Sequence, residues 1–419
     1  MAVNIKPSSI SGSLTAPSSK SSMQRACAAA LLHHGSSTLY NAGHSNDDLA
    51  ALEVIQNLGA TVHYNTDQSI TIKSSGIHPI SNNINFGESG LGIRMFAPIA
   101  ALSNALLVLN GKGSLGNRPM NFFDEIFPSL GIQIQSNKGK LPLTIQGPLM
   151  PADISVDGSL SSQFITGLLM AYTAANVEAT ITVNNLTSKP YIDLTLDVLK
   201  NFGFQLPLND DYRSFSFLPN KNLSPKHINY TVEGDWSSAS FLLVAAAIAG
   251  NITLKGLDVN SSQSDKAIIH ALILAGCKPV IDDNKISISS TDLQAFEFDA
   301  TDCPDLFPPL VALAAYCNGT TIIHGVNRLQ HKESNRGITL QEEFEKMGIA
   351  IQLHDDTMYI TGSEVVGTII NPHNDHRIAM ACAVAALRAK GNTIIDNPEV
   401  VNKSYPGFFI DLQQLQGIE

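Results

Sequence analysis

The sequence predicts an α/β (α+β) protein of two similar domains, and three observations lead to this fold class. A unit of about 70 residues recurs six times, and such self-similarity determines the architecture before any single residue is interpreted. Helical and β-branched segments alternate within each copy. The 419 residues are also too many for one ordinary hydrophobic core, so six copies in two groups of three are expected.

Each copy opens on a polar segment at a predicted helix start. These segments are SSKSSMQR (18–25), ESGLGIR (88–94), SSQF (161–164), GDWSSAS (234–240), DCPD (302–305) and NDHR (374–377). An apolar, Ala-rich helix follows each of them, and then a β-branched strand such as GNITLKGL or GTTIIHGV. In five copies a second helix ends at or near Gly and leads into a further strand, as in LEVIQNLGATVHY and EEFEKMGIAIQL.

The sixth copy is incomplete, since the chain ends after SYPGFFIDLQQLQGIE, whereas the N-terminal VNIKPSSISGSL is an unassigned strand-like segment. If this segment completes the domain that holds the C-terminus, one domain is discontinuous (1–13 plus 230–419) and the other continuous (14–229). Two chain crossings, near residue 14 and within PNKNLSPKHINYTVEGD, then form a hinge beside an interdomain cleft that would hold the active site. A linear solenoid without chemistry is the alternative, although solenoid repeats are usually only about 20 to 50 residues long.

Composition indicates a globular protein without nucleic-acid or membrane partners. Hydrophobic residues make up 44% of the chain and charged residues 15%. The longest apolar run, FLLVAAAIA, is about half the length that spans a bilayer, and MAVNIKPSS has no signal-peptide core. A net charge of −11 disfavours nucleic acid and anionic membranes, but it allows a small anionic substrate where basic residues gather.

The cysteines and histidines predict a reducing compartment and no metal. The five cysteines are odd in number, lie mostly in apolar helices and show no C-x-x-C spacing, which is typical of buried free thiols. The 12 histidines form no H-E-x-x-H or comparable ligand cluster. We therefore expect a soluble cytoplasmic protein without a metal ion or cofactor.

Side chains suited to anions collect at the helix starts. The first turn of a helix leaves backbone N–H groups unpaired and carries partial positive charge, which favours phosphate and carboxylate. The candidates are Lys20, Ser21, Arg25, Gly90, Arg94, Ser161, Ser162, Gln163 and Arg377. Taken singly, each is better explained as a helix cap or a surface charge, whereas together they favour an anion site.

Two further basic segments lie outside the helix starts. RLQHKESNR (328–336) follows a strand; if it is helical, Lys332 and Arg336 lie one turn apart on one face with Glu333 beside them. The alternative is a solvated helix start. LNGKGSLGNRP (109–119) is a glycine-rich loop after a strand, and it contains Arg118 as a candidate ligand. The alternative is an ordinary turn in which Arg118 is exposed to solvent.

Six motifs, in order and spacing, resemble the enolpyruvyl transferase family and specifically its shikimate branch, from about Ser11 to Phe409. They are P-x-S-K-S (17–21) with Arg25, S-S-Q-F (161–164), S-K-P-Y-I-D (188–193), V-E-G-D-x-S-S-A-S (232–240), K-E-S-x-R (332–336) and D-H-R (375–377). The resemblance implies two similar domains, each of three βαβαββ units in an inside-out barrel, closing over the substrates.

The resemblance also implies a reaction. The enolpyruvyl group of phosphoenolpyruvate would pass to the 5-hydroxyl of shikimate 3-phosphate by addition and elimination, releasing phosphate on the route to chorismate and the aromatic amino acids. By similarity, shikimate 3-phosphate is bound by Lys20, Ser21, Arg25, Ser161, Ser162, Gln163, Ser188, Tyr191, Asp305 and Lys332. Phosphoenolpyruvate is matched to Lys20, Gly90, Arg118, Gln163, Arg336, Arg377 and Lys403. Both substrates are polyanions, so dense cation and N–H donation is needed to offset their repulsion.

Three residues are matched to the proton transfers. Asp305 corresponds to the family's proton acceptor and Glu333 to the candidate acid, while Lys20 is an alternative for one transfer. Some neighbours depart from the commonest family pattern: Glu88 and Leu91 flank the expected phosphoenolpyruvate site. Because Gly90 is the small residue that would leave room for glyphosate, an inhibitor of this family, we expect sensitivity to it.

Two other functions are weighed against this one. The sister branch, which acts on UDP-N-acetylglucosamine, usually carries a reactive cysteine in the loop after the second copy's strand, and GKGSLGNRP has none. A non-catalytic anion-binding repeat protein would not need an acid and a base together. We expect a monomer whose partners are its two small-molecule substrates.

Overall fold

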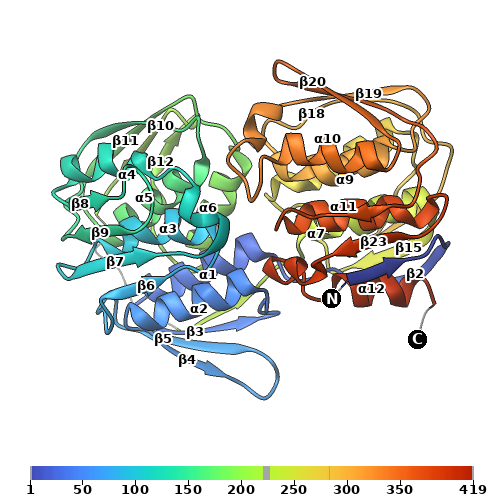
Figure 1. The fold of residues 1–419 in the computed structure, drawn as a ribbon. Helices are drawn as coiled ribbons and strands as arrows, with labels where there is room; N and C mark the ends of the chain where they lie inside the picture. The colour runs from blue at the N-terminus through green and yellow to red at the C-terminus, as the bar shows by residue number, and fades with distance from the viewer. Residues whose placement is uncertain (1, 220–226, 283, 418–419) are drawn as a thin grey trace. The chain divides into compact units, whose positions relative to one another are not determined.

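The computed structural model describes residues 2–219, 227–282 and 284–417, which form two compact units (Figure 1). We call Ser18–Val232 the continuous unit, and Met1–Pro17 with Glu233–Glu419 the discontinuous unit. The sequence analysis placed the boundaries at 13/14 and 229/230. In the structure both boundaries lie a few residues later, at 17/18 and 232/233. The N-terminal strand stays paired up to Thr15, and Ile228–Thr231 pairs with a strand of the continuous unit. Residues 220–226, part of the second predicted crossing, lie outside the described residues.

One arrangement recurs in the described residues: strand, helix, strand, helix and a final pair of strands. The first strand pairs in parallel with the second, which pairs antiparallel with the last, as β10 (Ile154–Asp157), β11 (Ala179–Asn184) and β13 (Ser214–Phe217) do. Five sheets have four strands, one has three, and none of them closes into a barrel in the described part of the chain. The expected α/β fold built from βαβαββ units is confirmed.

The continuous unit holds three of these sheets and the helices that follow their strands. Its strands, in sheet order, are β14 (Ile228–Thr231), β3 (Gly35–Tyr40), β5 (Ile70–Ser74) and β4 (Thr61–Tyr64); β6 (Asn83–Asn85), β7 (Leu106–Asn110), β9 (Leu143–Gln146) and β8 (Gln133–Ser136); and β10, β11, β13 and β12 (Leu208–Asp210). Its helices are α1 (Lys20–Leu32), α2 (Asn46–Asn57), α3 (Gly90–Ala100), η1 (Gly113–Asn117), α4 (Asn121–Ile126), η2 (Phe127–Leu130), α5 (Ser162–Ala175) and α6 (Pro190–Asn201).

The discontinuous unit repeats the plan. Its strands, in sheet order, are β16 (Val280–Asp282), β17 (Lys285–Ser289), β15 (Gly250–Lys255) and β2 (Ile10–Thr15); β18 (Glu297–Asp299), β19 (Thr320–His324), β21 (Thr357–Thr361) and β20 (Ala350–His354); and β1 (Ala2–Ile5), β23 (Thr393–Asp396) and β22 (Ile369–Ile370). Its helices are α7 (Trp236–Ala249), η3 (Ser264–Ala267), α8 (Ile268–Leu274), η4 (Pro304–Leu306), α9 (Phe307–Ala314), η5 (Val326–Leu329), α10 (Arg336–Lys346), α11 (His376–Ala385), η6 (Ala386–Arg388), η7 (Pro398–Lys403) and α12 (Phe408–Leu415).

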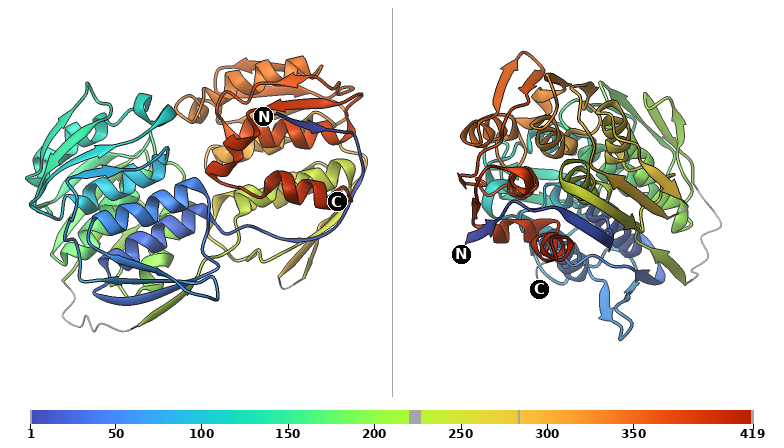
Figure 2. Two further views of the ribbon diagram at one scale, coloured as in Figure 1. Left: turned by 60° about the horizontal axis from the view of Figure 1, so that its bottom comes forward. Right: turned by 90° about the vertical axis from the view of Figure 1, so that its right-hand side faces the viewer.

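Both chain termini belong to the discontinuous unit. The N-terminal strand β1 pairs antiparallel with β23, and β2 pairs in parallel with β15. Figure 2 shows the blue N-terminal segment running among the yellow and red elements of this unit. Near the other terminus, the Gln416 side chain donates to the Ser8 hydroxyl at 2.6 Å and to the Lys6 carbonyl at 3.3 Å. The N-terminal segment therefore supplies a strand to the fourth repeat and another to the sixth.

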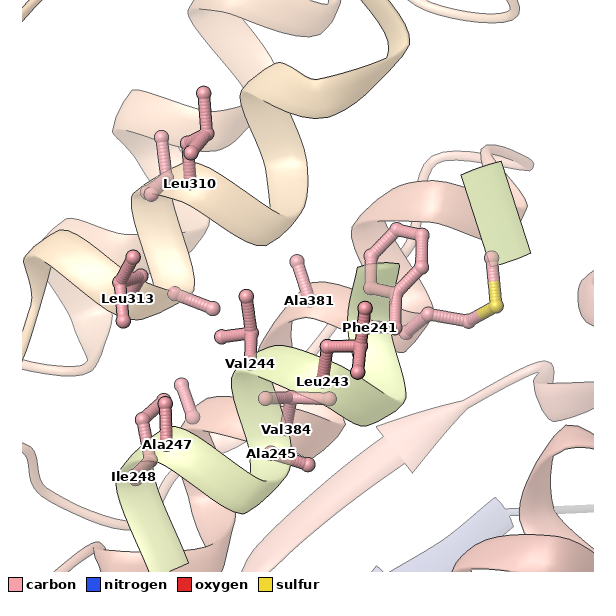
Figure 3. Close-up of a cluster of buried hydrophobic side chains, with 14 of the residues drawn as sticks. Phe241, Leu243, Val244, Ala245, Ala247, Ile248, Leu310, Leu313, Ala381 and Val384 are labelled. Carbon is pink, nitrogen blue, oxygen red and sulfur yellow. The ribbon is translucent and has the colours of Figure 1, made fainter. Parts of the chain in front are cut away.

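Three helices form the centre of each unit. Helix α7 is apolar all round and every one of its residues is buried, as expected for a helix enclosed by protein. It packs against α9 and α11, which also contact each other (Figure 3). In the continuous unit, α1, α3 and α5 contact one another in the same way. Since each unit encloses a single core, a linear solenoid is excluded.

Polar side chains cap most of these central helices. Ser19, Ser89, Ser161, Asp235 and Asp375 each accept a hydrogen bond from a backbone N–H in the first turn of the helix that follows. The polar repeat starts thus have a structural role. The charged candidates stand one or more residues beyond the cap, so capping does not use their side chains, whereas Ser161 is both a cap and a candidate ligand.

Candidate active site

In the discontinuous unit, a fully buried arginine is the centre of an ion-pair cluster. Arg336, the first residue of α10, donates to Asp375 at 2.9 Å and 3.2 Å, to Asp305 at 2.8 Å and to Glu333 at 2.6 Å. Burial lowers the pKa of Arg336, but Asp375, Glu333 and Asp305 outweigh it and raise the pKa above its usual value. The guanidinium is charged at any working pH, and its fork joins three carboxylates.

Asp305 lies in η4, immediately before α9, and contacts three cations. Its carboxylate accepts from Lys332 Nζ at 3.1 Å, from Arg336 Nη1 at 2.8 Å and from Arg377 Nη2 at 3.2 Å. Burial opposes ionisation of Asp305, but Arg377, Lys332 and Arg336 together hold its pKa well below the usual range. Asp305 is therefore ionised and has an electron pair available to accept a proton.

Glu333 and Lys332 reach the cluster from the turn before α10. Glu333 Oε1 lies 3.4 Å from Lys403 Nζ, while Oε2 accepts from Arg336. Because α10 begins only at Arg336, the helical interpretation of RLQHKESNR is wrong for residues 330–335, and Lys332 and Arg336 do not lie one turn apart on a helix. They converge on Asp305 nevertheless, since the turn folds Lys332 back onto it. Burial lowers the pKa of Lys332.

Arg377 combines a bound guanidinium nitrogen with an unpaired one. Its Nη2 donates to Asp305, and its backbone N–H donates to the α11 cap Asp375 at 3.0 Å. Its Nη1 is buried and finds no hydrogen-bond partner among the described residues. A buried N–H without a partner is costly, so this atom is a candidate donor to an anionic ligand.

In the continuous unit, Arg25 is buried and held by uncharged acceptors. It donates to the Thr195 hydroxyl at 2.9 Å, to the Ser21 carbonyl at 2.9 Å and to the Tyr191 carbonyl at 3.3 Å. Its guanidinium carbon also lies 5.8 Å from the centre of the Tyr191 ring. These contacts orient the guanidinium group, as a phosphate site requires.

Lys20 opens α1, and its ammonium is paired with a residue that sequence reasoning did not single out. Lys20 Nζ lies 3.0 Å from Asp47 Oδ2, and Asp47 is almost fully buried. A capping box between Ser45 and Asp48 fixes the first turn of α2, which carries Asp47. The signal for this position was the run SNDDL, an N-cap followed by two acidic residues.

The α3 start gathers two arginines. An added Cβ on Gly90 would overlap Nη1 of Arg118, so Arg118 lies directly against the first residue of α3. Arg94 Nη1 donates to the Gln163 side chain at 3.0 Å, and its guanidinium carbon lies 4.9 Å from the centre of the Phe164 ring. Arg94, a helix-start candidate of the sequence analysis, therefore joins α3 to the start of α5, a contact that the sequence did not predict.

Three serines complete the predicted residues of this unit. Ser161 caps α5 and accepts from the Gln163 N–H at 3.3 Å, and Ser162 beside it is buried. Ser188 is buried in a left-handed conformation (φ 56°) shortly before α6 and accepts from the Tyr191 N–H at 3.1 Å. Both segments present small hydroxyls next to helix starts.

The predicted site residues divide into two sets, one in each unit. The continuous unit holds Lys20, Ser21, Arg25, Gly90, Arg118, Ser161, Ser162, Gln163, Ser188 and Tyr191, and the discontinuous unit holds Asp305, Lys332, Glu333, Arg336, Arg377 and Lys403. In the described residues, no three His, Cys, Asp or Glu side chains gather in a way that could hold a metal ion, and no helix has the length and apolarity of a membrane span. All five cysteines are buried free thiols.

Comparison with known proteins identifies what this chain is similar to. A family model described as EPSP synthase (3-phosphoshikimate 1-carboxyvinyltransferase) matches residues 5–412. The 3-phosphoshikimate 1-carboxyvinyltransferase of Clostridium perfringens (strain SM101) is 37% identical, over 99% of this chain and 98% of the relative, and that of Clostridium kluyveri is 36% identical, over 99% and 97%. A solved EPSP synthase from Acinetobacter baumannii superposes with a TM-score of 0.81 at 26% identity, covering 99% of this chain and 97% of that one.

Proposed function

The chain belongs to the EPSP synthase (3-phosphoshikimate 1-carboxyvinyltransferase) family, and from this premise we propose how its residues carry out the reaction. It is an enolpyruvyl transferase of the shikimate pathway. The enolpyruvyl group of phosphoenolpyruvate passes to the 5-hydroxyl of shikimate 3-phosphate, and inorganic phosphate is released. No metal or cofactor takes part in the mechanism proposed below.

The observation that carries the residue assignment is Asp305, an ionised carboxylate between three cations. In the proposed addition step, Asp305 accepts the proton of the 5-hydroxyl while the oxygen attacks C2 of phosphoenolpyruvate. The methylene carbon of phosphoenolpyruvate gains a proton, and a tetrahedral intermediate forms. In the elimination step, that methyl carbon loses a proton, the carbon–oxygen bond to phosphate breaks, and the vinyl ether double bond is restored.

Glu333 is the proposed acid for the methylene carbon. It contacts Arg336 and Lys403, so it can deliver a proton only after anionic substrates have weakened these ion pairs. Lys20, paired with Asp47, is the alternative for one of the two transfers. In this proposal the substrates replace these ion-pair partners before either group transfers a proton.

Shikimate 3-phosphate is assigned mainly to the continuous unit. Arg25, oriented by its contacts with Thr195 and Ser21, is suited to the phosphate, and the Tyr191 ring beside it is suited to the carbocycle. The full proposed set is Lys20, Ser21, Arg25, Ser161, Ser162, Gln163, Ser188 and Tyr191, joined by Asp305 and Lys332.

Phosphoenolpyruvate is assigned to arginines of both units. Arg377 offers the unpaired buried Nη1, and planar guanidinium groups suit the carboxylate and the phosphate of this substrate. The full proposed set is Lys20, Gly90, Arg118, Gln163, Arg336, Arg377 and Lys403. Because the two clusters act on one pair of substrates, loss of either cluster should abolish turnover.

A coupled phosphate-release assay tests the function. The purified chain should release phosphate from phosphoenolpyruvate only when shikimate 3-phosphate is also present. The same assay with UDP-N-acetylglucosamine in place of shikimate 3-phosphate tests for the activity of the sister branch. That activity is disfavoured because the loop GKGSLGNRP carries no cysteine. Absence of phosphate release from folded protein with both substrates would contradict the proposal.

We further propose a cytoplasmic monomer. The support for the location is the set of five unpaired thiols, which suits a reducing compartment. Light scattering coupled to size exclusion should give the mass of one 44.8 kDa chain, and a dimer mass would contradict this. Cell fractionation tests the location.

A further inference from the structure

Helix α10 carries two buried charges of opposite sign on one face. Arg336 and Glu343 are seven residues apart, which is close to two helical turns, and neither side chain is exposed to solvent. Arg336 belongs to the site described above. Glu343 has no role in the mechanism derived so far.

The Glu343 carboxylate receives three hydrogen bonds. Its Oε2 accepts from the backbone N–H of Asn371 at 3.1 Å, and its Oε1 accepts from His373 Nε2 at 2.9 Å and from Lys346 Nζ at 2.7 Å. A carboxylate is buried at a large cost in solvation unless such donors replace water. Two of the three donors come from the segment that precedes α11, so the carboxylate fastens that segment to α10.

The fastened segment is a turn in an unfavourable conformation. His373 and Asn374 are consecutive and both left-handed, with φ values of 52° and 56°, although neither is glycine. The turn is closed by the His373 N–H, which donates to the Asn371 side chain at 2.9 Å. Two consecutive left-handed residues are uncommon, so contacts from the surroundings help to hold this turn in place.

Helix α10 holds this turn at both of its ends. Glu343 binds Asn371 and His373 on one side, and Arg336 binds Asp375 through two hydrogen bonds on the other. Arg377 lies two residues after Asp375, the N-cap of α11, and its side chain donates to Asp305. The position of the α11 start, and with it that of Arg377, thus depends on how the turn is fastened.

We propose that Glu343 is a positioning residue for the reaction. It holds the Asn371–Asp375 turn so that Asp375 and Arg377 meet the Asp305 cluster in the geometry that phosphoenolpyruvate needs; this role rests on the function proposed above. A purely structural residue at this buried position could be apolar, like its neighbours Leu340 and Phe344, because well-packed apolar side chains often stabilise a fold as much as a buried ion pair does.

The test compares Glu343→Gln with Glu345→Gln. Both substitutions remove one negative charge from α10, but Glu345 is exposed. We expect Glu343→Gln to raise KM for phosphoenolpyruvate about tenfold, because small displacements of a binding group are costly, while KM for shikimate 3-phosphate changes by less than about twofold. Hydrogen exchange at the Asn371 amide should also be faster than in Glu345→Gln.

The possible results distinguish failure of the proposed function from failure of the positioning role of Glu343. If the wild-type chain releases no phosphate, the proposed function fails, whereas the exchange measurement still tests the turn. If Glu343→Gln matches Glu345→Gln in both KM values and in exchange, the positioning role is wrong. It is also wrong if the two KM values rise together in proportion to a lower melting temperature, since that would indicate a merely structural residue.

A second variant covers the case in which Glu343→Gln does not fold. His373→Asn removes one donor from a partly exposed position, and asparagine adopts the left-handed conformation readily. Its KM for phosphoenolpyruvate should rise about threefold, in the direction expected for Glu343→Gln. The exposed His354→Asn is the matched control, and equal kinetics in these two variants would overturn the proposal.

Discussion

Arg336 and Asp375 are joined at two points while both side chains are fully buried. Arg336 Nε donates to Asp375 Oδ2 at 2.9 Å, and Nη2 donates to Oδ1 at 3.2 Å. Asp375 is also the N-cap of α11 and accepts from the Ser334 hydroxyl at 3.2 Å. One ion pair therefore joins the start of α10, the turn before it and the start of α11.

Arg336→Lys should destabilise the protein and weaken phosphoenolpyruvate binding. A lysine cannot make the two-point contact and leaves buried carboxylate oxygens unpaired, so we expect the free energy of unfolding to fall by about 3 kcal/mol. Urea unfolding and KM for phosphoenolpyruvate measure the two effects. The control is Arg213→Lys, whose ion pair with Asp210 is exposed and should change stability by no more than about 0.5 kcal/mol. Equal unfolding curves for the two variants would contradict the structural account.

Asp305→Asn should lower kcat by about 10²- to 10⁴-fold, because the amide cannot accept the hydroxyl proton. Phosphate release under saturating substrates measures the change. Asp302→Asn alters an exposed carboxylate three residues away and should keep near-normal turnover. The three cations hold the pKa of Asp305 well below its usual range, so lowering the pH from 7 to 5 should not protonate it in the free enzyme. A loss of kcat/KM in that interval that disappears in Asp305→Asn would mean that Asp305 titrates there.

The repeats, and with them the fold, could be predicted from the sequence because helix caps and strand patterns are local. The incomplete sixth repeat predicted only that the unassigned N-terminal segment joins the domain with the C-terminus, and its pairing with β23 and β15 was not predicted. The domain boundaries were less precise, because a strand such as β2 continues as long as its partner provides hydrogen bonds, whatever its composition.

The site was predictable only in part. The motifs singled out the charged residues, but the pairing of Lys20 with Asp47 and of Arg94 with Gln163 was not predicted, since tertiary packing alone decides which helix starts meet. The turn at 330–335 had a pattern equally suited to a helix, and the contacts of Lys332 and Glu333 decided its conformation. Glu343 looked like one more acidic residue in an acidic helix, because no local signal distinguishes a buried carboxylate from an exposed one.

Gly90→Ala should weaken the binding of phosphoenolpyruvate and reduce inhibition by glyphosate, which we propose occupies the same space. The added methyl group would overlap Arg118 Nη1 and displace it, whereas alanine suits the first turn of α3, so folding should be preserved. Gly116→Ala is the control, since its Cβ would meet nothing within 4 Å. The measurements are KM and the inhibition constant of glyphosate for both variants. Unchanged glyphosate inhibition in Gly90→Ala, or wild-type turnover in millimolar glyphosate, would contradict this placement of the inhibitor.

Asp48→Asn should gain stability relative to the wild type as the pH rises. Burial, the largest cause, raises the pKa of Asp48 from 3.8 to about 6, although hydrogen bonds from Ser45 oppose it. Between these values the folded chain keeps a proton that the unfolded chain releases, so the wild type loses stability as pH rises through this window. The asparagine does not titrate, and its side-chain oxygen can still accept from Ser45. Its free energy of unfolding, relative to wild type, should therefore rise by about 2 to 3 kcal/mol between pH 4 and pH 7.

Urea unfolding at the two pH values measures this difference, and Asp67→Asn provides a control whose difference from wild type should stay nearly constant over the same interval. Hydrogen bonds from Ser69 hold the pKa of Asp67 below its usual value, so the Asp67 carboxylate adds stability above that value and loses it as the pH falls. Asp67→Asn should accordingly lose stability relative to wild type only as the pH rises toward about 4, and it should change little between pH 4 and pH 7. If both variants changed alike between pH 4 and pH 7, burial of Asp48 at the capped start of α2 would not be the cause of its raised pKa.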